Sequence, residues 1–182
     1  MFFKMRSAYF AAALASVLTV AAVASAKYKA QNPKIQVHAK GPAGMKIEGV
    51  SNTLKIDEDE KVVKFKTYLN TIDTKNGKRN DHMQNRFEAK KHGEIVLSVP
   101  RTLADPKAGN TVDGKLRFHG VEKDVKVKYD VSGSHIHAAF SFDVTHHGIN
   151  KKDLCFEPTT ESICAQVLVS VEVDFDLANS KD

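Results

Sequence analysis

Apolar and polar residues alternate along most of this chain, and a period of two restricts such segments to β-strands with one buried face. The clearest example is the last one, where Val167, Val169, Val171, Val173, Phe175 and Leu177 alternate with polar residues. Similar segments start near Lys34, Val63, Ile95 and Val125, and most are joined by turn-length connections. This pattern predicts an all-β fold of about eight antiparallel strands, either a sandwich or a barrel.

One segment, Arg79 to Lys91, does not alternate. Met83 and Phe87 lie four residues apart there, so they would be neighbours on one face of a helix. We therefore expect a short helix of two or three turns that packs Met83 and Phe87 against the sheet. Its candidate caps are Asn80 or Asp81 at the start and Gly93 at the end.

The first 26 residues have the composition of a cleaved signal peptide. Lys4 and Arg6 precede the uncharged run Ser7 to Val23, and Ala24-Ser25-Ala26 is a small-residue cleavage site. A retained membrane anchor is the alternative, but the alanine-rich run and the adjacent cleavage site favour removal. We expect residues 1–26 to be removed and residues 27–182 to form one exported domain, with Lys27 to Pro33 as a loose polar arm.

The net charge of +5, from 27 basic and 22 acidic residues, is mild and scattered along the chain. This distribution does not suggest a nucleic-acid-binding protein. After the leader, no apolar run approaches the ~18 residues of a membrane span.

Cys155 and Cys164 are the only cysteines, with eight residues between them. In an exported protein the expected state of such a pair is a disulfide. Zinc-binding pairs usually have two to four intervening residues, so this spacing fits a metal site poorly.

Four of the eight histidines suggest an alternative function, because they could bind a metal if the chain brought them together. His135 and His137 share one face of a strand, and His146 and His147 follow that strand. However, His135 and His137 alternate with apolar residues and so belong to the solvated face. We therefore expect no metal site and no cofactor, and keep a metal-buffering protein as the second hypothesis.

Catalytic motifs are sparse. The sequence has no Gly-x-Ser-x-Gly elbow, no His-Glu-x-x-His and no phosphate-binding glycine loop. Asp81-His82 could orient an imidazole, which leaves a lipid head-group hydrolase as a third hypothesis. We expect a protein that is not an enzyme.

The apolar face carries most of the functional information. About eight strands that close on themselves can hold one small ligand. The alternation alone does not exclude a packed interior in which Phe65, Phe118, Phe140 and Phe142 leave no space, and that is the commoner outcome for such a pattern.

Three stretches together resemble the YceI-like family of exported, lipocalin-like proteins. They are Ile72 to Met83, with Arg79 and His82; Val112 to Val121, which reads Gly-Lys-Leu-Arg-Phe-His-Gly-Val from Gly114; and Ala139 to Ile149. The sequence departs from the family pattern at Asn80, where the family usually has Asp, and at Thr145 and His146 before the last turn.

The resemblance implies an extended antiparallel β-barrel with a lipocalin-like cavity, a periplasmic location, and a long isoprenoid or other long-chain lipid as partner. It also implies structural roles for Arg79, His82, Gly114, His119 and Gly120, which would anchor the helix and its hairpin. A homodimer is expected only if a barrel edge or mouth leaves apolar surface exposed. From strand parity and the helix face, the residues expected to line the cavity are Phe65, Leu69, Met83, Phe87, Leu97, Phe118, Phe140, Phe142, Ile149 and Val171.

Overall fold

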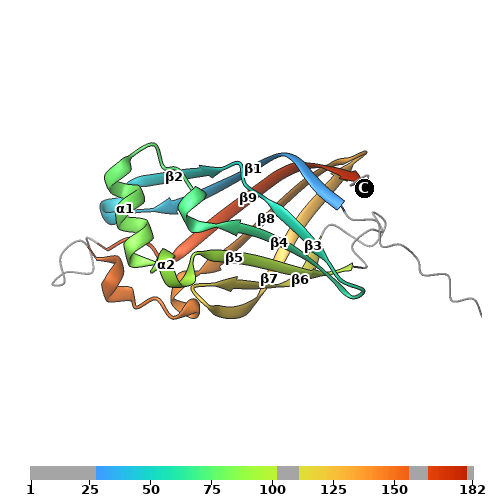
Figure 1. Ribbon diagram of the computed structural model, residues 1–182. Helices are drawn as coiled ribbons and strands as arrows, with labels where there is room; N and C mark the ends of the chain where they lie inside the picture. Colours follow the sequence, from blue (N-terminus) through green and yellow to red (C-terminus); the bar gives the residue numbers. More distant parts are fainter. Residues whose placement is uncertain (1–27, 102–110, 156–163, 180–182) are drawn as a thin grey trace, which may run out of the picture.

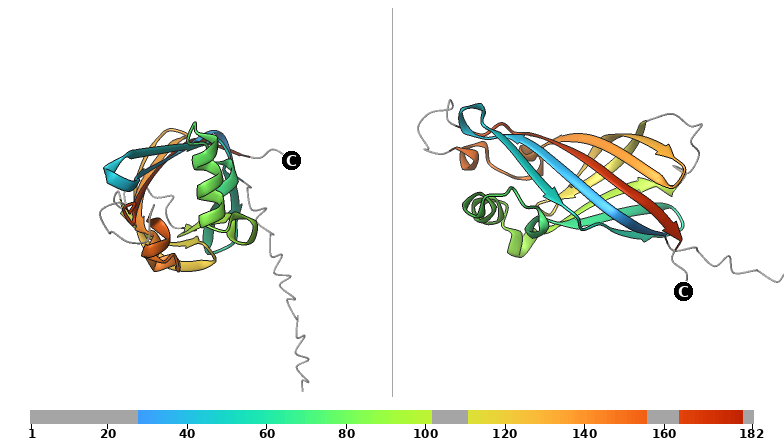
Figure 2. Two further views of the ribbon diagram at one scale, coloured as in Figure 1. Left: turned by 90° about the vertical axis from the view of Figure 1, so that its left-hand side faces the viewer. Right: turned by 90° about the horizontal axis from the view of Figure 1, so that it is seen from above.

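The computed structural model describes residues 28–101, 111–155 and 164–179. In these residues nine strands form one antiparallel sheet, in the order β2-β1-β9-β8-β7-β6-β5-β4-β3. The sheet curls into an open barrel (Figure 1; Figure 2, left). The strands are β1 (Tyr28–Lys40), β2 (Lys46–Ser51), β3 (Lys55–Glu58), β4 (Val62–Tyr68), β5 (Glu94–Pro100), β6 (Thr111–Phe118), β7 (Val121–Ser132), β8 (His135–Asp143) and β9 (Leu168–Asn179). The prediction of an all-β, antiparallel, barrel-like fold is confirmed, with nine strands rather than about eight.

The two edge strands of the sheet, β2 and β3, are short, and contacts at both ends link the two sides of the seam. The backbone N–H of Tyr28 donates to Glu58 Oε1 at 2.8 Å, which joins the start of β1 to the end of β3. Towards the other end, Val50 in β2 and Asp73 exchange two backbone hydrogen bonds, at 2.9 and 2.8 Å. Because short edges present few unpaired backbone groups, this arrangement limits edge-to-edge aggregation.

Strand β1 starts earlier than the sequence predicts. The expected loose arm is instead paired with β9, from Tyr28 opposite Asn179 onwards. The register shifts between Gln31 and Lys34, where Asn32 has a φ of 49°. This irregularity carries the strand past Pro33, which cannot donate to the ladder. The prediction was wrong because backbone pairing with β9 holds this segment in the sheet without apolar alternation.

The inserted helical segment is two helices rather than one. Helix α1 (Gly77–Arg86) is capped by Asn76, four residues before the first predicted cap, Asn80, and Asn76 Oδ1 accepts from the Arg79 N–H at 3.1 Å. It ends at Phe87, and Glu88 adopts a left-handed conformation with a φ of 45° before α2 (Ala89–His92). Gly93 is the C-cap of α2, as predicted. The position requires glycine, because a Cβ there would lie 2.3 Å from the Ala89 carbonyl oxygen.

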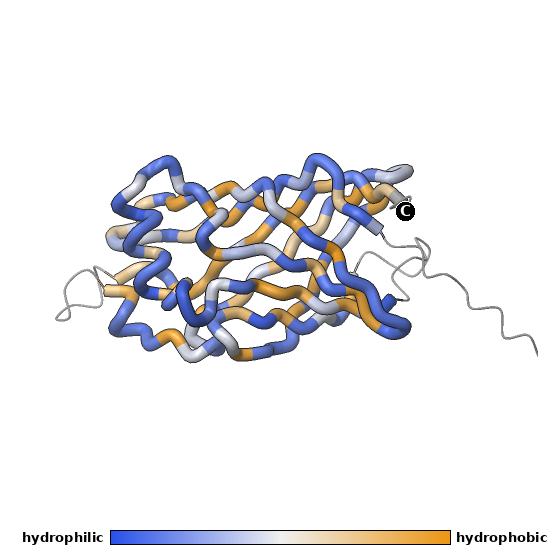
Figure 3. Tube along the Cα trace, in the orientation of Figure 1, coloured by the Kyte–Doolittle hydropathy of each residue, from blue (hydrophilic) through white to orange (hydrophobic). Residues whose placement is uncertain are grey.

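The strands place their apolar residues on the inner face, as the alternation predicts. Along β7, Val125 and Val127 are buried whereas Lys126 and Lys128 are exposed. Figure 3 shows the same alternation of hydrophobic and hydrophilic positions along the strands, whereas α1 is mostly hydrophilic. No helix in the described part of the chain is both long and apolar enough to cross a membrane. The predicted signal peptide lies outside the described residues.

A disulfide joins Cys155 and Cys164, as predicted. The residues next to it, Leu154 and Ala165, both contact the interior of the barrel. The bridge therefore holds the connection between β8 and β9 against the barrel wall.

Replacing both cysteines by serine is expected to lower the free energy of unfolding by about 2–3 kcal/mol, because the bridge closes a short loop in the unfolded chain. Urea denaturation of the oxidised protein and of the variant measures this difference. A reductant should destabilise the natural protein by the same amount and leave the variant unaffected. Equal stability of the oxidised protein and the variant would contradict the prediction.

Candidate functional site

The interior of the curled sheet is a cavity of about 620 Å³. This volume lies within the ~300–1,000 Å³ range of small-molecule sites. All nine strands except β3 contribute side chains to its wall, and most of these are aliphatic or aromatic. The cavity extends from residues beside α1 to Val131, Ile136 and Phe175, which lie towards the opposite ends of their strands. The barrel is therefore hollow along much of its length.

Nine of the ten residues predicted to line the cavity do so: Phe65, Leu69, Met83, Phe87, Leu97, Phe118, Phe140, Phe142 and Val171. Ile149 is the exception and corrects the prediction. It is only 5% exposed and belongs to the buried core, but it does not contact the cavity. It follows Gly148, whose φ of 81° reverses the chain after the 3-10 turn η4 (Val144–His147). Strand parity does not extend through such a turn.

Helix α1 lies across one end of the barrel (Figure 2, left). Met83 and Phe87 contact the cavity from this helix, as the four-residue spacing predicts. The Phe87 ring packs edge-on against Phe118 of β6, with 5.3 Å between ring centroids. Phe118 in turn contacts Phe142 of β8, also at 5.3 Å. This aromatic cluster attaches the helix to the sheet at the mouth of the cavity.

The first turn of α1 is held by a side chain that differs from the family pattern. Asn80 Oδ1 accepts from the N–H of Thr74 at 2.9 Å and from its hydroxyl at 2.6 Å. The Asn80 amide donates to Asp73 Oδ1 at 2.8 Å and thereby lowers the pKa of that carboxyl. An aspartate at position 80 would place a second carboxylate against Asp73, so the amide suits this loop.

Basic side chains surround the mouth, and this feature was missed by sequence reasoning. Basic side chains from β1 and α1 contact the cavity, and no described aspartate or glutamate is among the residues that line it. The residues are Lys40, Lys78, Arg79, His82 and Arg86, which we call the basic rim. The i, i+4 and i, i+7 spacings within α1 place its members on one face, but a sequence pattern cannot show that this face meets the cavity.

Most of the basic rim is not neutralised by the residues that the structure describes. Lys40, Lys78, Arg79 and Arg86 form no ion pair with residues 28–101, 111–155 or 164–179. Arg86 donates one hydrogen bond, to the Cys155 carbonyl oxygen at 3.2 Å. Among the described residues, the mouth therefore carries excess positive charge above an apolar interior.

The five residues to which the resemblance assigns structural roles have different positions in the structure, and two of them belong to the basic rim. Arg79 and His82 line the cavity in addition to building α1. At Gly114 a Cβ would lie 3.1 Å from the Ser98 carbonyl oxygen, so glycine lets β6 approach β5 closely. His119 and Gly120 form the tight turn between β6 and β7, both with positive φ (49° and 75°).

The four histidines of the second hypothesis do not converge. His135 and His137 lie on the outer face of β8, with their Nδ1 atoms 3.2 Å from Asp176 Oδ1 and 2.8 Å from Asp174 Oδ1. His147 lies beyond the other end of β8, is 1% exposed, and donates from Nδ1 to the Val121 carbonyl oxygen at 2.9 Å. A nine-residue strand separates the two pairs by roughly 25 Å.

Asp81 and His82, the pair behind the hydrolase hypothesis, do not both face the cavity. Consecutive residues of a helix point about 100° apart. His82 lines the cavity, whereas Asp81 does not.

Comparison with known proteins shows that other proteins have a similar fold. Two solved structures are similar over nearly their whole length. One is a polyisoprenoid binding domain from Saccharophagus degradans, with 14% identity and a TM-score of 0.62 over 85% of this chain and 99% of that chain. The other is BcnA from Burkholderia cenocepacia, with 17% identity and a TM-score of 0.58 over 81% of this chain and 96% of that one. At these identities the likeness shows a shared fold.

No curated protein sequence matches the chain. The family model described as YceI-like domain matches residues 13–178, which is most of the sequence. This match agrees with the motifs around Arg79, Gly114 and His119 and with the hollow, curled sheet described above. The chain belongs to the YceI-like domain family.

Proposed function

We propose that this protein binds a long-chain amphiphile, with the apolar tail inside the barrel and an anionic head group at the basic rim. The observation that carries the proposal is the pairing of a 620 Å³ apolar cavity with a mouth that, within the described ranges, is lined by Lys78, Arg79 and Arg86 and by no carboxylate. A purely apolar ligand would have no use for these cations. A small polar ligand would leave the apolar interior unfilled.

The energetics fit an amphiphile with a tail of moderate length. Each buried methylene contributes about 0.8 kcal/mol, so ten of them contribute ~8 kcal/mol before the cost of ordering the chain. This gross term corresponds to a dissociation constant of about 1 μM. Contacts between the head group and the basic rim would add to it and would select the charge of the ligand.

A polyisoprenoid is the tail that we propose first, because the Saccharophagus degradans structure is described as a polyisoprenoid binding domain. The predicted signal peptide supports a periplasmic location, where a carrier of such lipids would shield them from water. In this proposal the protein binds and releases its ligand unchanged and performs no chemistry on it.

Native mass spectrometry of the delipidated mature protein tests the proposal. Prenyl phosphates, prenyl alcohols and fatty acids of matched length are offered one at a time. We expect one ligand per protein, with the phosphate retained best. Failure to take up any of these amphiphiles would reject the proposal.

Reversing two charges of the basic rim, Lys78→Glu with Arg79→Glu, is expected to weaken prenyl phosphate binding by about tenfold or more, because close charged contacts contribute on the order of 1–3 kcal/mol. Prenyl alcohol binding should change little. The control, Lys123→Glu with Lys128→Glu, makes the same change in net charge at two exposed positions of β7, neither of which lines the cavity. An equal loss in both double variants, or an equal loss for both ligands, would contradict a head-group role for the rim.

A further inference from the structure

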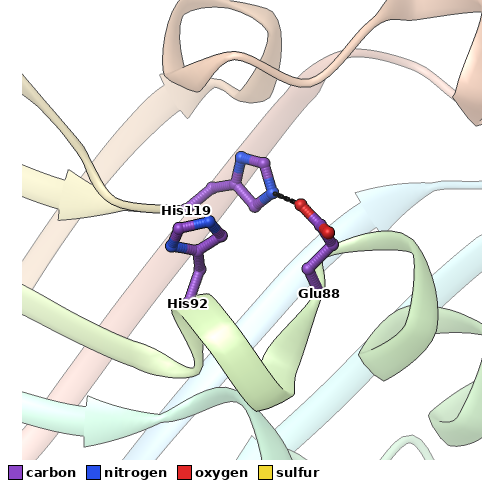
Figure 4. A group of neighbouring side chains, drawn as sticks. All are labelled: Glu88, His92 and His119. Carbon is purple, nitrogen blue, oxygen red and sulfur yellow. Dashed lines mark ion pairs between the residues drawn. The ribbon is translucent and has the colours of Figure 1, made fainter.

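Three ligand-type side chains from separate parts of the chain meet outside the lipid cavity. Glu88 precedes α2, His92 ends it, and His119 lies in the turn between β6 and β7 (Figure 4). One ligand atom from each residue lies within 4.8 Å of the others. None of the three lines the cavity, so the cluster is separate from the lipid site.

His119 is oriented as metal-binding histidines usually are. Its Nδ1 lies 3.2 Å from the His147 carbonyl oxygen. Because a carbonyl can only accept, Nδ1 carries a hydrogen, and Nε2 is the ring nitrogen that is left to bind a metal. A second hydrogen bond of this kind, from the ring nitrogen that does not bind the metal to a backbone carbonyl, is the usual support for a ligating histidine.

His119 Nε2 faces a carboxylate. His119 Nε2 is buried, and Glu88 Oε2 lies 3.3 Å from it, a separation that forms an ion pair if the ring is protonated (Figure 4). Such an approach of an imidazole nitrogen to a carboxylate oxygen requires either a proton or a metal ion between them. Two ligands that are each about 2.0 Å from a tetrahedral zinc ion lie ~3.3 Å apart, which matches the observed separation.

The third ligand and the surroundings also fit a metal. The His92 ring packs edge-on against His119, with 4.7 Å between centroids. Gly120 makes room for it, since a Cβ at that position would lie 2.9 Å from His92 Nδ1. Lys91 binds the other carboxylate oxygen of Glu88, Oε1, at 2.8 Å and leaves Oε2 for the ion. Glu88 is exposed and His92 is half-buried, which leaves an entry path from solvent.

We propose that Glu88, His92 and His119 bind one divalent transition-metal ion, and that zinc is the best match. Two imidazoles and one carboxylate are a recurrent zinc ligand set, with water in the fourth position. The ion would join α2 to the β6–β7 turn and so hold the helical segment against the sheet. A small rotation of His92, which must approach the other two ligands, completes the site.

The test uses the tag-free, delipidated mature chain. After incubation with zinc and dialysis, elemental analysis is expected to find one zinc per protein, and cobalt substitution should give the visible absorption of a tetrahedral site. Zinc should also raise the melting temperature. His92→Ala and Glu88→Gln should each weaken binding by more than the ~10–100-fold that loss of an outer-shell partner costs. Circular dichroism checks that each variant is folded.

The control is the double variant His135→Ala with His137→Ala, which removes two exposed histidines from outside the cluster. It should keep full zinc stoichiometry and affinity. The proposal is overturned if the natural protein retains no zinc, or if the control loses zinc while His92→Ala retains it. In either case a proton rather than a metal would separate His119 from Glu88. Since the protein is free of lipid, neither result depends on the proposed lipid-binding function.

Discussion

Replacing Ala138 with tryptophan is expected to reduce lipid affinity by about 100-fold with little loss of stability. Ala138 lies in the middle of β8, opposite Val173 of β9, and its side chain lines the cavity. An indole there would occupy space that the tail needs. Displacing about four methylenes from the cavity costs ~3 kcal/mol, which is roughly 100-fold in affinity. Titration of a fluorescent lipid measures the affinity, and urea denaturation measures the stability.

The matched control is Ala139→Trp, at the next position of the same strand. Ala139 does not line the cavity, because consecutive side chains of a strand point to opposite faces. This variant should bind lipid normally. In a solidly packed interior, overpacking at Ala138 would instead cost about 1–3 kcal/mol of stability. A strongly destabilised Ala138→Trp protein, or one with unchanged affinity, would therefore contradict a hollow barrel.

Phe118→Ala is expected to lower the free energy of unfolding by about 3–5 kcal/mol and to loosen α1. Phe118 is 4% exposed and contacts the rings of Phe87, Phe142 and His147. Its contact with Phe87 is the aromatic link between the helix and the sheet. Hydrogen exchange followed by mass spectrometry compares the variant with the natural protein. The increase in exchange rate should be larger in α1 than in the strands.

Phe175→Ala is the control that separates the general loss of stability from the loosening of α1. Phe175 is also buried, but it lies towards the opposite end of the barrel. It is 2% exposed and packs against Phe65, with 5.7 Å between ring centroids. We expect a comparable loss of stability with no selective change in α1. If both variants affected α1 equally, or neither did, the aromatic cluster would not be what holds the helix over the mouth.

The alternation was sufficient to predict the strands and their inner face. Side chains of a strand point to alternate sides whatever strand lies beside it, so Phe65, Phe118 and Phe140 could be assigned to the interior without a partner being known. The prediction failed where the backbone leaves this period. Ile149 follows a left-handed glycine, and the start of β1 contains a bulge at Asn32.

The extent of the helical segment also depended on local conformations that have weak sequence signals. Asn76 caps α1 from within a loop, and Glu88 divides the segment with a positive φ that a glutamate rarely adopts. Helix periodicity identified Met83 and Phe87 as inward-facing residues, but it did not identify the boundaries on which the basic rim depends.

By itself, the sequence determined the type of fold, the apolar face and the cysteine pair, because each depends on local periodicity or on composition. Only the tertiary structure decided that the interior is hollow, since volume depends on how far the sheet curls before it meets itself. It also decided which charged groups meet. Lys40 reaches the mouth beside α1, and His119 meets Glu88 and His92, across stretches of chain that no periodicity relates.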